Sequence, residues 1–90
     1  MDELLTVFVT DSPAAAGGRG RLVFIAGRKT GGAVARNRCK RVMRAAVQRA
    51  GGPWPGKDAA FIAKASLGLA PAIAVDRSVV QHLRRLGVVS

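Results

Sequence analysis

Hydrophobic and polar residues alternate along the first segment of the chain, LLTVFVT, from Leu4 to Thr10. Alternation combined with β-branched residues predicts a half-buried β-strand. Successive side chains of a strand point to opposite faces, so one face carries Leu5, Val7 and Val9 and the other carries Thr6, Phe8 and Thr10. Residues 11–20, DSPAAAGGRG, have no periodicity and predict a loop.

Two later segments are apolar almost without interruption. RLVFIAGRK, residues 21–29, is typical of a central strand that is buried on both faces and delivers Arg28 and Lys29 to its far end. DAAFIAKA, residues 58–65, predicts another buried strand. Between them, residues 33–50 follow a helical pattern, which the sequence GGPWPG ends with a glycine at the C-cap and a proline just beyond.

The last periodic segment follows the break GLAP, residues 68–71. We expect Asp76 or Ser78 to cap a final helix that runs through Leu86. The apolar stripe of this helix would consist of Val79, Val80, Leu83 and Leu86. The predicted order is therefore β, β, α, β, α, and 90 residues leave room for a single domain, residues 1–90.

The helix predicted over residues 33–50 has two unlike faces. An arc of about 100° collects the apolar residues Ala35, Cys39, Val42, Met43, Ala46 and Ala50, and predicts the face toward the core. A second arc of about 140° is almost purely cationic and collects Arg36, Lys40, Arg44, Asn37 and Arg41. Like charges three or four residues apart on a helix repel each other. Because no Asp or Glu lies between Asp11 and Asp58 to offset this repulsion, the pattern favours a polyanion lying along the helix.

The composition points the same way. Fifteen Lys and Arg against five Asp and Glu give a formal charge of +10, and the isoelectric point is about 11.8. With 49% hydrophobic residues and a mean hydropathy of +0.18, the chain is expected to fold as a globular domain. More than half of the basic residues lie between residues 27 and 49, and this concentration favours nucleic acid as the partner over a domain that is merely basic. The segment GRKTGG also leads into a helix N-terminus, which attracts phosphate.

The sequence offers no convincing catalytic or metal site. GGPWPGKD imitates a phosphate-binding P-loop, but Asp58 stands where the hydroxyl that holds Mg²⁺ is needed, and the segment follows a helix instead of a strand. Cys39 belongs to the core-facing arc, His82 lies on the final helix, and the acidic residues are dispersed. We therefore expect no catalytic residue, no bound metal and no small-molecule substrate.

The surroundings of the protein are also constrained. A lone Cys39 cannot form an intramolecular disulfide, as is usual for a reducing cytoplasm. The acidic start MDELLTVFVTD is unlike a signal peptide, and its apolar run is too short to span a bilayer. The basic helix lacks the Trp, Phe and Leu of helices that lie on membranes, so we expect a cytoplasmic protein without a membrane partner.

The basic segment resembles a known family. GRKTGGAVARNRCKRVMRAAVQRAG, followed by DAAFIAKA, is similar to the protein component of bacterial ribonuclease P, whose signature is K-x-G-x-A-V-x-R-N-R-x-K-R-x-x-R. Arg36, Asn37, Arg38, Lys40, Arg41 and Arg44 fall on this signature in register. The resemblance covers roughly residues 4–87 and is most specific from Arg28 to Arg44.

The resemblance implies an accessory subunit of a ribonucleoprotein endonuclease. In that family the RNA carries out the hydrolysis with Mg²⁺ ions that it mainly holds itself, while the protein grips the catalytic RNA and the 5′ leader of precursor tRNA. It also implies an α/β fold, more strictly an α+β sandwich, in which helices pack on a small mixed sheet as in domain 2 of ribosomal protein S5, with a left-handed βαβ crossover. Sequence spacing alone favours a right-handed crossover.

The resemblance further assigns residues to two surfaces. RNA-binding positions are Arg28, Lys29, Arg36, Asn37, Arg38, Lys40, Arg41 and Arg44. Family members usually begin with a helix and aromatic residues that form one wall of the leader cleft, whereas this sequence starts at the strand, through a late start, a trimmed end or a natural short form. We expect Phe8 and Lys64 to belong to what remains of the cleft, with core or edge packing as the alternative for both. The alternative function is a non-enzymatic RNA-binding or ribosome-associated protein that uses the same basic helix.

Overall fold

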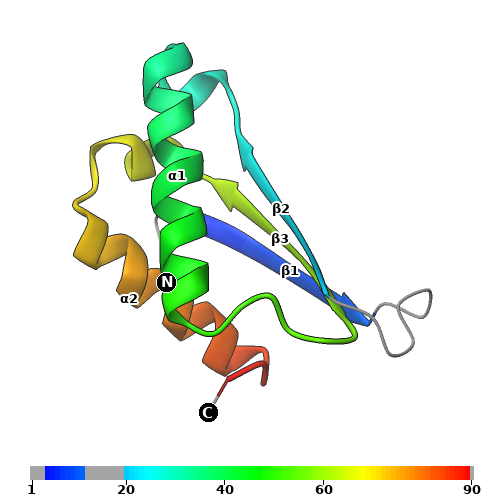
Figure 1. Cartoon of the computed structure of the whole chain (residues 1–90). Coiled ribbons are helices and arrows are strands. Elements are labelled where there is room, and N and C mark those ends of the chain that lie inside the picture. The colour runs from blue at the N-terminus through cyan, green and yellow to red at the C-terminus, as the bar shows by residue number, and fades with distance from the viewer. Residues whose placement is uncertain (1–3, 12–19, 90) are drawn as a thin grey trace.

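The computed structural model describes residues 4–11 and 20–89, which form a three-stranded sheet and two α-helices (Figure 1). In chain order the elements are β1 (Leu5–Asp11), β2 (Arg21–Ala26), α1 (Ala33–Arg49), β3 (Lys57–Ala63) and α2 (Ala72–Arg85). Two short 3-10 helices, η2 (Arg28–Thr30) and η3 (Ala65–Leu69), were not expected from the sequence. The predicted order β, β, α, β, α is confirmed, while the loop predicted over residues 11–20 lies mostly outside the described residues.

The sheet is mixed, with strand order β1-β3-β2. β1 is antiparallel to β3 and β2 is parallel to it, so β3 is the central strand and β2 an edge strand. The prediction that β2 is central and buried on both faces is therefore wrong. With β2 and β3 pointing upward and α1 in front of the sheet, β3 lies to the left of β2, so the crossover through α1 is left-handed (Figure 1). This confirms the fold that the family resemblance implied, and the expectation from spacing was wrong.

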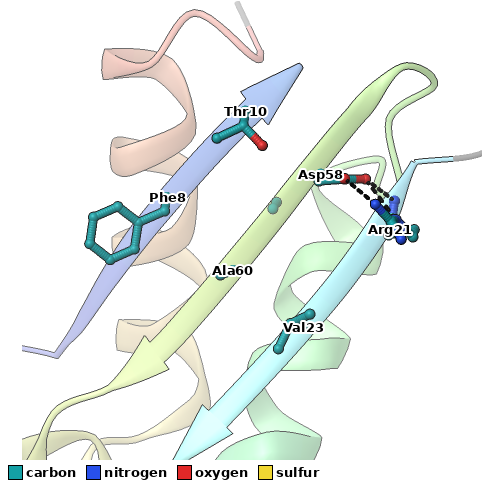
Figure 2. Close-up of a pocket in the computed structure, with 7 residues that line it drawn as sticks. Phe8, Thr10, Arg21, Val23, Asp58 and Ala60 are labelled. Carbon is teal, nitrogen blue, oxygen red and sulfur yellow. Dashed lines mark hydrogen bonds and ion pairs between the residues drawn. The ribbon is translucent and has the colours of Figure 1, made fainter. Parts of the chain in front are cut away.

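Both helices pack on one face of the sheet, and the core lies between the two layers (Figures 1 and 2). The largest fully buried side chain of the core is Phe61 on β3, which has no exposed surface. The fully buried side chains around it come from every layer: Leu5, Cys39, Met43, Val47, Leu67, Val75, Val79 and Leu83. The opposite face of the sheet is not covered by any described element.

Helix α1 has nearly the bounds that its sequence predicts. Its N-cap is Gly32. Gly31 before it has a φ of +122°, a backbone conformation that residues other than glycine rarely adopt. At the other end the C-cap is Ala50, and Gly51, which was predicted to be the C-cap, lies one residue beyond it with a φ of +100°. Among the described residues, neither helix is long and apolar enough to cross a membrane.

Helix α2 begins four residues before the first of the two caps predicted for it. Pro71 is the N-cap, and its carbonyl oxygen accepts hydrogen bonds from the N–H groups of Ala74 and Val75. Proline suits a helix start because its φ is fixed and it has no N–H to satisfy. Asp76 and Ser78 are therefore not caps: Asp76 pairs with Arg49 of α1, and Ser78 is buried.

The position of Cys39 gives a first test of the fold. Its side chain has no exposed surface, because it faces the sheet from the middle of α1. We predict that a bulky maleimide labels the native protein far more slowly than the protein in denaturant. Equal labelling rates in the two conditions would contradict the placement of α1.

Candidate nucleic-acid interface

The outer surface of α1 divides into three strips. The outermost strip holds Asn37, Arg41 and Gln48, all of them exposed. These positions share an arc of about 40° on the helix and have no acidic neighbour on α1. Because nothing on the helix neutralises it, this strip is open to an anionic ligand.

The second strip of α1 faces β2. Here the guanidinium carbon of Arg44 lies 5.3 Å from the centre of the Phe24 ring, a cation–π contact. Phe24 in turn stacks on Phe61, with ring centres 5.5 Å apart and an angle of 19° between the rings. Arg36 and Lys40, on the same side of the helix, are half-buried. The packing thus limits where the Arg44 cation can move while leaving the residue exposed.

The third strip of α1 faces α2, and its two arginines bind other parts of the chain. Arg38 donates two hydrogen bonds, 3.2 Å to the carbonyl oxygen of Gly68 and 3.0 Å to that of Ala70. Arg49 forms an ion pair with Asp76, whose carboxylate raises the pKa of Arg49 through a hydrogen bond. Arg38, predicted to bind RNA with its neighbours, therefore points away from the outermost strip.

The uncovered face of the sheet, called the open face below, is built from three rows of residues that pair across the strands. Each row takes one residue from β1, one from β3 and one from β2. The rows are Thr10, Asp58 and Arg21; Phe8, Ala60 and Val23; and Thr6, Ile62 and Ile25. Phe8, Val23 and Ile25 are 58%, 51% and 44% exposed, so the open face presents apolar surface to solvent.

A shallow hollow of about 290 Å³ lies on the first two rows (Figure 2). The small side chain of Ala60 separates Phe8 from Val23 and leaves space between them. At its end Arg21 and Asp58 form an ion pair of 2.8 Å, and this pairing raises the pKa of Arg21 through a hydrogen bond. The hollow therefore has an apolar floor and a polar end.

A second, larger hollow of about 650 Å³ continues from the third row to the carboxyl ends of β2 and β3. Its apolar floor includes Ile25 and Ile62, and its rim carries Arg28, Lys29 and Lys64, all exposed. We call this region the basic end of the open face. Phe8 and Lys64, which were expected to share one cleft, line different hollows of the same face.

The described residues show how the acidic groups are used. Asp11, Asp58 and Asp76 each form an ion pair with a cation on another element. The hydrogen bond from Lys57 holds the pKa of Asp11 below its usual value. In the parts of the chain that the structure describes, no three His, Cys, Asp or Glu side chains lie close enough together to hold a metal ion.

The sequence reasoning missed the contribution of β2 to the open face. Arg21, Val23 and Ile25 point outward there, while Leu22, Phe24 and Ala26 point to the core. The polar residue Arg21 at the start of β2 was a weak sign that one face of this strand is exposed. The alternation does not continue, because Val23 and Ile25 on the same face are apolar.

Comparison with known proteins agrees with this geometry. The family model of ribonuclease P matches residues 2–87, so the chain belongs to the ribonuclease P family. It is a protein component of bacterial ribonuclease P, an endoribonuclease complex that processes tRNA. No curated protein sequence matches the chain.

Solved structures share the fold at low sequence identity. The ribonuclease P protein of Staphylococcus aureus has a TM-score of 0.84 and 21% identity, with 100% of this chain and 81% of that chain covered. A mutant of that protein with defective mRNA degradation activity has a TM-score of 0.82 and 21% identity, with 97% and 72% covered. The ribonuclease P protein of Thermotoga maritima in complex with 1-(4-fluorophenyl)-2-thiourea has a TM-score of 0.76 and 24% identity, with 94% and 81% covered.

The contact between Arg44 and Phe24 can be measured as a coupling free energy. We predict that Arg44→Ala and Phe24→Leu, made singly and together, give a coupling of about 0.5–1 kcal/mol in the free energy of unfolding. Arg41→Ala, on the exposed strip of the same helix, is the control and is expected to show no coupling to Phe24→Leu. Equal coupling for both arginines would mean that the effect arises from charge alone.

Proposed function

We propose that the protein is the RNA-binding subunit of ribonuclease P and uses two surfaces. The outer surface of α1 binds the catalytic RNA, and the open face of the sheet receives the 5′ leader of precursor tRNA. The observation that carries the proposal is the pairing of an exposed, acid-free cationic helix with an open apolar sheet face in a chain of this family.

The α1 surface suits a folded RNA. Asn37 and Arg41 are exposed, Arg44 is held over Phe24, and Arg36 and Lys40 lie beside them. Arginine and lysine bind phosphate oxygens and release counterions, and the Asn37 amide can both donate to a phosphate and accept from a ribose 2′-hydroxyl. Contacts of this kind are made to the sugar–phosphate backbone and position the protein on a folded RNA without reading its sequence.

The open face suits a single strand. Phe8 offers an aromatic ring that is more than half exposed, and bases of any sequence stack on such rings. Neighbouring rows of the open face are about 7 Å apart along a β-strand. An RNA single strand that crosses the rows therefore passes from the Phe8 hollow to the basic end. There Arg28, Lys29 and Lys64 can neutralise its phosphates.

We further propose that hydrolysis is carried out by the RNA with Mg²⁺ held mainly by the RNA. The described carboxylates support this division, because Asp11, Asp58 and Asp76 are already paired with cations. The contribution of the chain is to offset the repulsion between two polyanions, the catalytic RNA and the precursor tRNA. An effect of this kind is largest when few Mg²⁺ ions are present to screen the phosphates.

Reconstitution tests the proposal against the alternative of a non-enzymatic RNA-binding protein. We predict that adding the protein to a bacterial ribonuclease P RNA raises the cleavage rate of precursor tRNA at low Mg²⁺, and that the gain shrinks as Mg²⁺ increases. A protein that binds the RNA tightly without changing cleavage at any Mg²⁺ concentration would support the alternative.

Two substitutions should separate the two surfaces. Arg41→Ala removes one phosphate contact, so we predict that the log–log salt slope for binding the catalytic RNA falls by up to about one unit. Phe8→Ala should leave that slope unchanged and reduce the preference for precursor over mature tRNA, because only the precursor has a leader.

Arg85→Ala, in the last turn of α2, is the matched control for lost charge. It should weaken binding less than Arg41→Ala does. Equal losses at both helices would show that the total positive charge, and not the α1 surface, determines binding.

A further inference from the structure

The basic end of the open face depends on two short segments that pack on each other. η2 carries Arg28 and Lys29, and η3 begins just after Lys64. They meet where Gly68 passes Thr30 so closely that an added Cβ at Gly68 would lie 2.9 Å from the Thr30 carbonyl oxygen. Thr30 is itself buried and donates from its hydroxyl to the Gly27 carbonyl oxygen at 2.7 Å. The positions of the three cations therefore depend on how firmly η3 is held.

Arg38 is the side chain from α1 that holds the end of η3. Its two terminal nitrogens donate to the carbonyl oxygens of Gly68 and Ala70, on either side of Leu69. A planar guanidinium can span two acceptors in this way, whereas an ammonium group is a single point charge. Leu67 and Ala70, buried on either side of this turn, anchor the segment from the core. The Arg38 bonds thus join α1 to η3 across the chain.

We propose that Arg38 is a positioning residue: it supports the basic end of the open face through η3 and η2 and does not itself bind an RNA phosphate. This inference rests on the proposed function for the role of Arg28, Lys29 and Lys64. It separates Arg38 from Arg41, although both are arginines of the same basic segment. Arg38 lies about 60° around the helix from Arg41, on the strip that faces α2.

Conservative substitution distinguishes the two roles. A phosphate contact that depends on charge alone survives in Arg38→Lys. The paired hydrogen bonds to the carbonyl oxygens of Gly68 and Ala70 do not, because an ammonium group cannot span both acceptors. We predict that Arg38→Lys and Arg38→Ala both raise amide hydrogen exchange at Leu67 and Ala70 at least tenfold, because these N–H groups close the turns of η3. Arg41→Lys and Arg41→Ala, the matched controls, should leave exchange at these amides unchanged.

The preference of the assembled ribonucleoprotein for precursor over mature tRNA gives the second readout, under conditions where all variants are folded, because Arg28, Lys29 and Lys64 lie on the face proposed for the leader. We predict that Arg38→Lys loses as much of this preference as Arg38→Ala does, while the affinity for the catalytic RNA and its salt slope stay close to those of the unmodified protein. In a protein that already carries Arg28→Ala and Lys29→Ala, removal of Arg38 should cost less further preference for precursor tRNA, because two of the three cations that it positions are gone.

Near-normal exchange and precursor preference in Arg38→Lys, with a salt slope for the catalytic RNA lower by about one unit in Arg38→Ala, would overturn the proposal in favour of a direct phosphate contact. Faster exchange with an unchanged preference for precursor tRNA would also overturn it, because Arg38 would then stabilise the fold alone. Failure of the unmodified protein to bind the RNA would instead contradict the proposed function, while the exchange result would still test the support of η3.

Discussion

The structure depends on the packing of one stripe of α1 against the sheet. Cys39, Met43 and Val47 have no exposed surface, and they belong to the same core cluster as Phe61 of the central strand. Burial of these side chains fixes the rotation of α1 about its axis, because an apolar stripe stabilises the protein only when it faces the core. Once this rotation is set, the outermost strip with Asn37 and Arg41 must face solvent.

The same packing accounts for the two surfaces. Both helices occupy one side of a three-stranded sheet, so the other side keeps an apolar floor without a described covering element. The cations of α1 then differ in their surroundings. Arg38 and Arg49 bind the chain itself, Arg44 lies over Phe24, and Arg41 is exposed to solvent. A run of like charge in the sequence is therefore divided by the fold into groups that bind the chain itself and groups that face solvent.

Local sequence patterns correctly predicted the features that depend only on residues close together in the sequence. The bounds of α1 and the unequal faces of β1 follow from periodicity, glycine placement and alternation, which are properties of neighbouring residues. The predicted start of α2 was wrong, because Asp76 and Ser78 are residue types that often cap helices. In the structure Pro71 is the N-cap, and Asp76 pairs with Arg49.

Features that depend on distant contacts were not predictable in the same way. β2 lies at the edge of the sheet because β3 pairs with both other strands. This position cannot be predicted from the sequence of β2 alone. The bonds from Arg38 to Gly68 and Ala70 join residues about thirty positions apart, so the family signature showed the arginine but not its partners. The left-handed crossover came from the resemblance, because spacing favours the opposite hand.

Tethered cleavage of RNA tests the two-surface account most directly. Because Cys39 is buried, an iron chelate can be attached to a cysteine introduced at Gln48 on α1, at Thr10 on the open face or at Gln81 on the exposed side of α2. In the assembled ribonucleoprotein with precursor tRNA, the account predicts that the Gln48 probe cuts the catalytic RNA and the Thr10 probe cuts the leader, while the Gln81 probe cuts both weakly. Strongest cutting from Gln81, or equal cutting of both RNAs from Gln48 and Thr10, would contradict it.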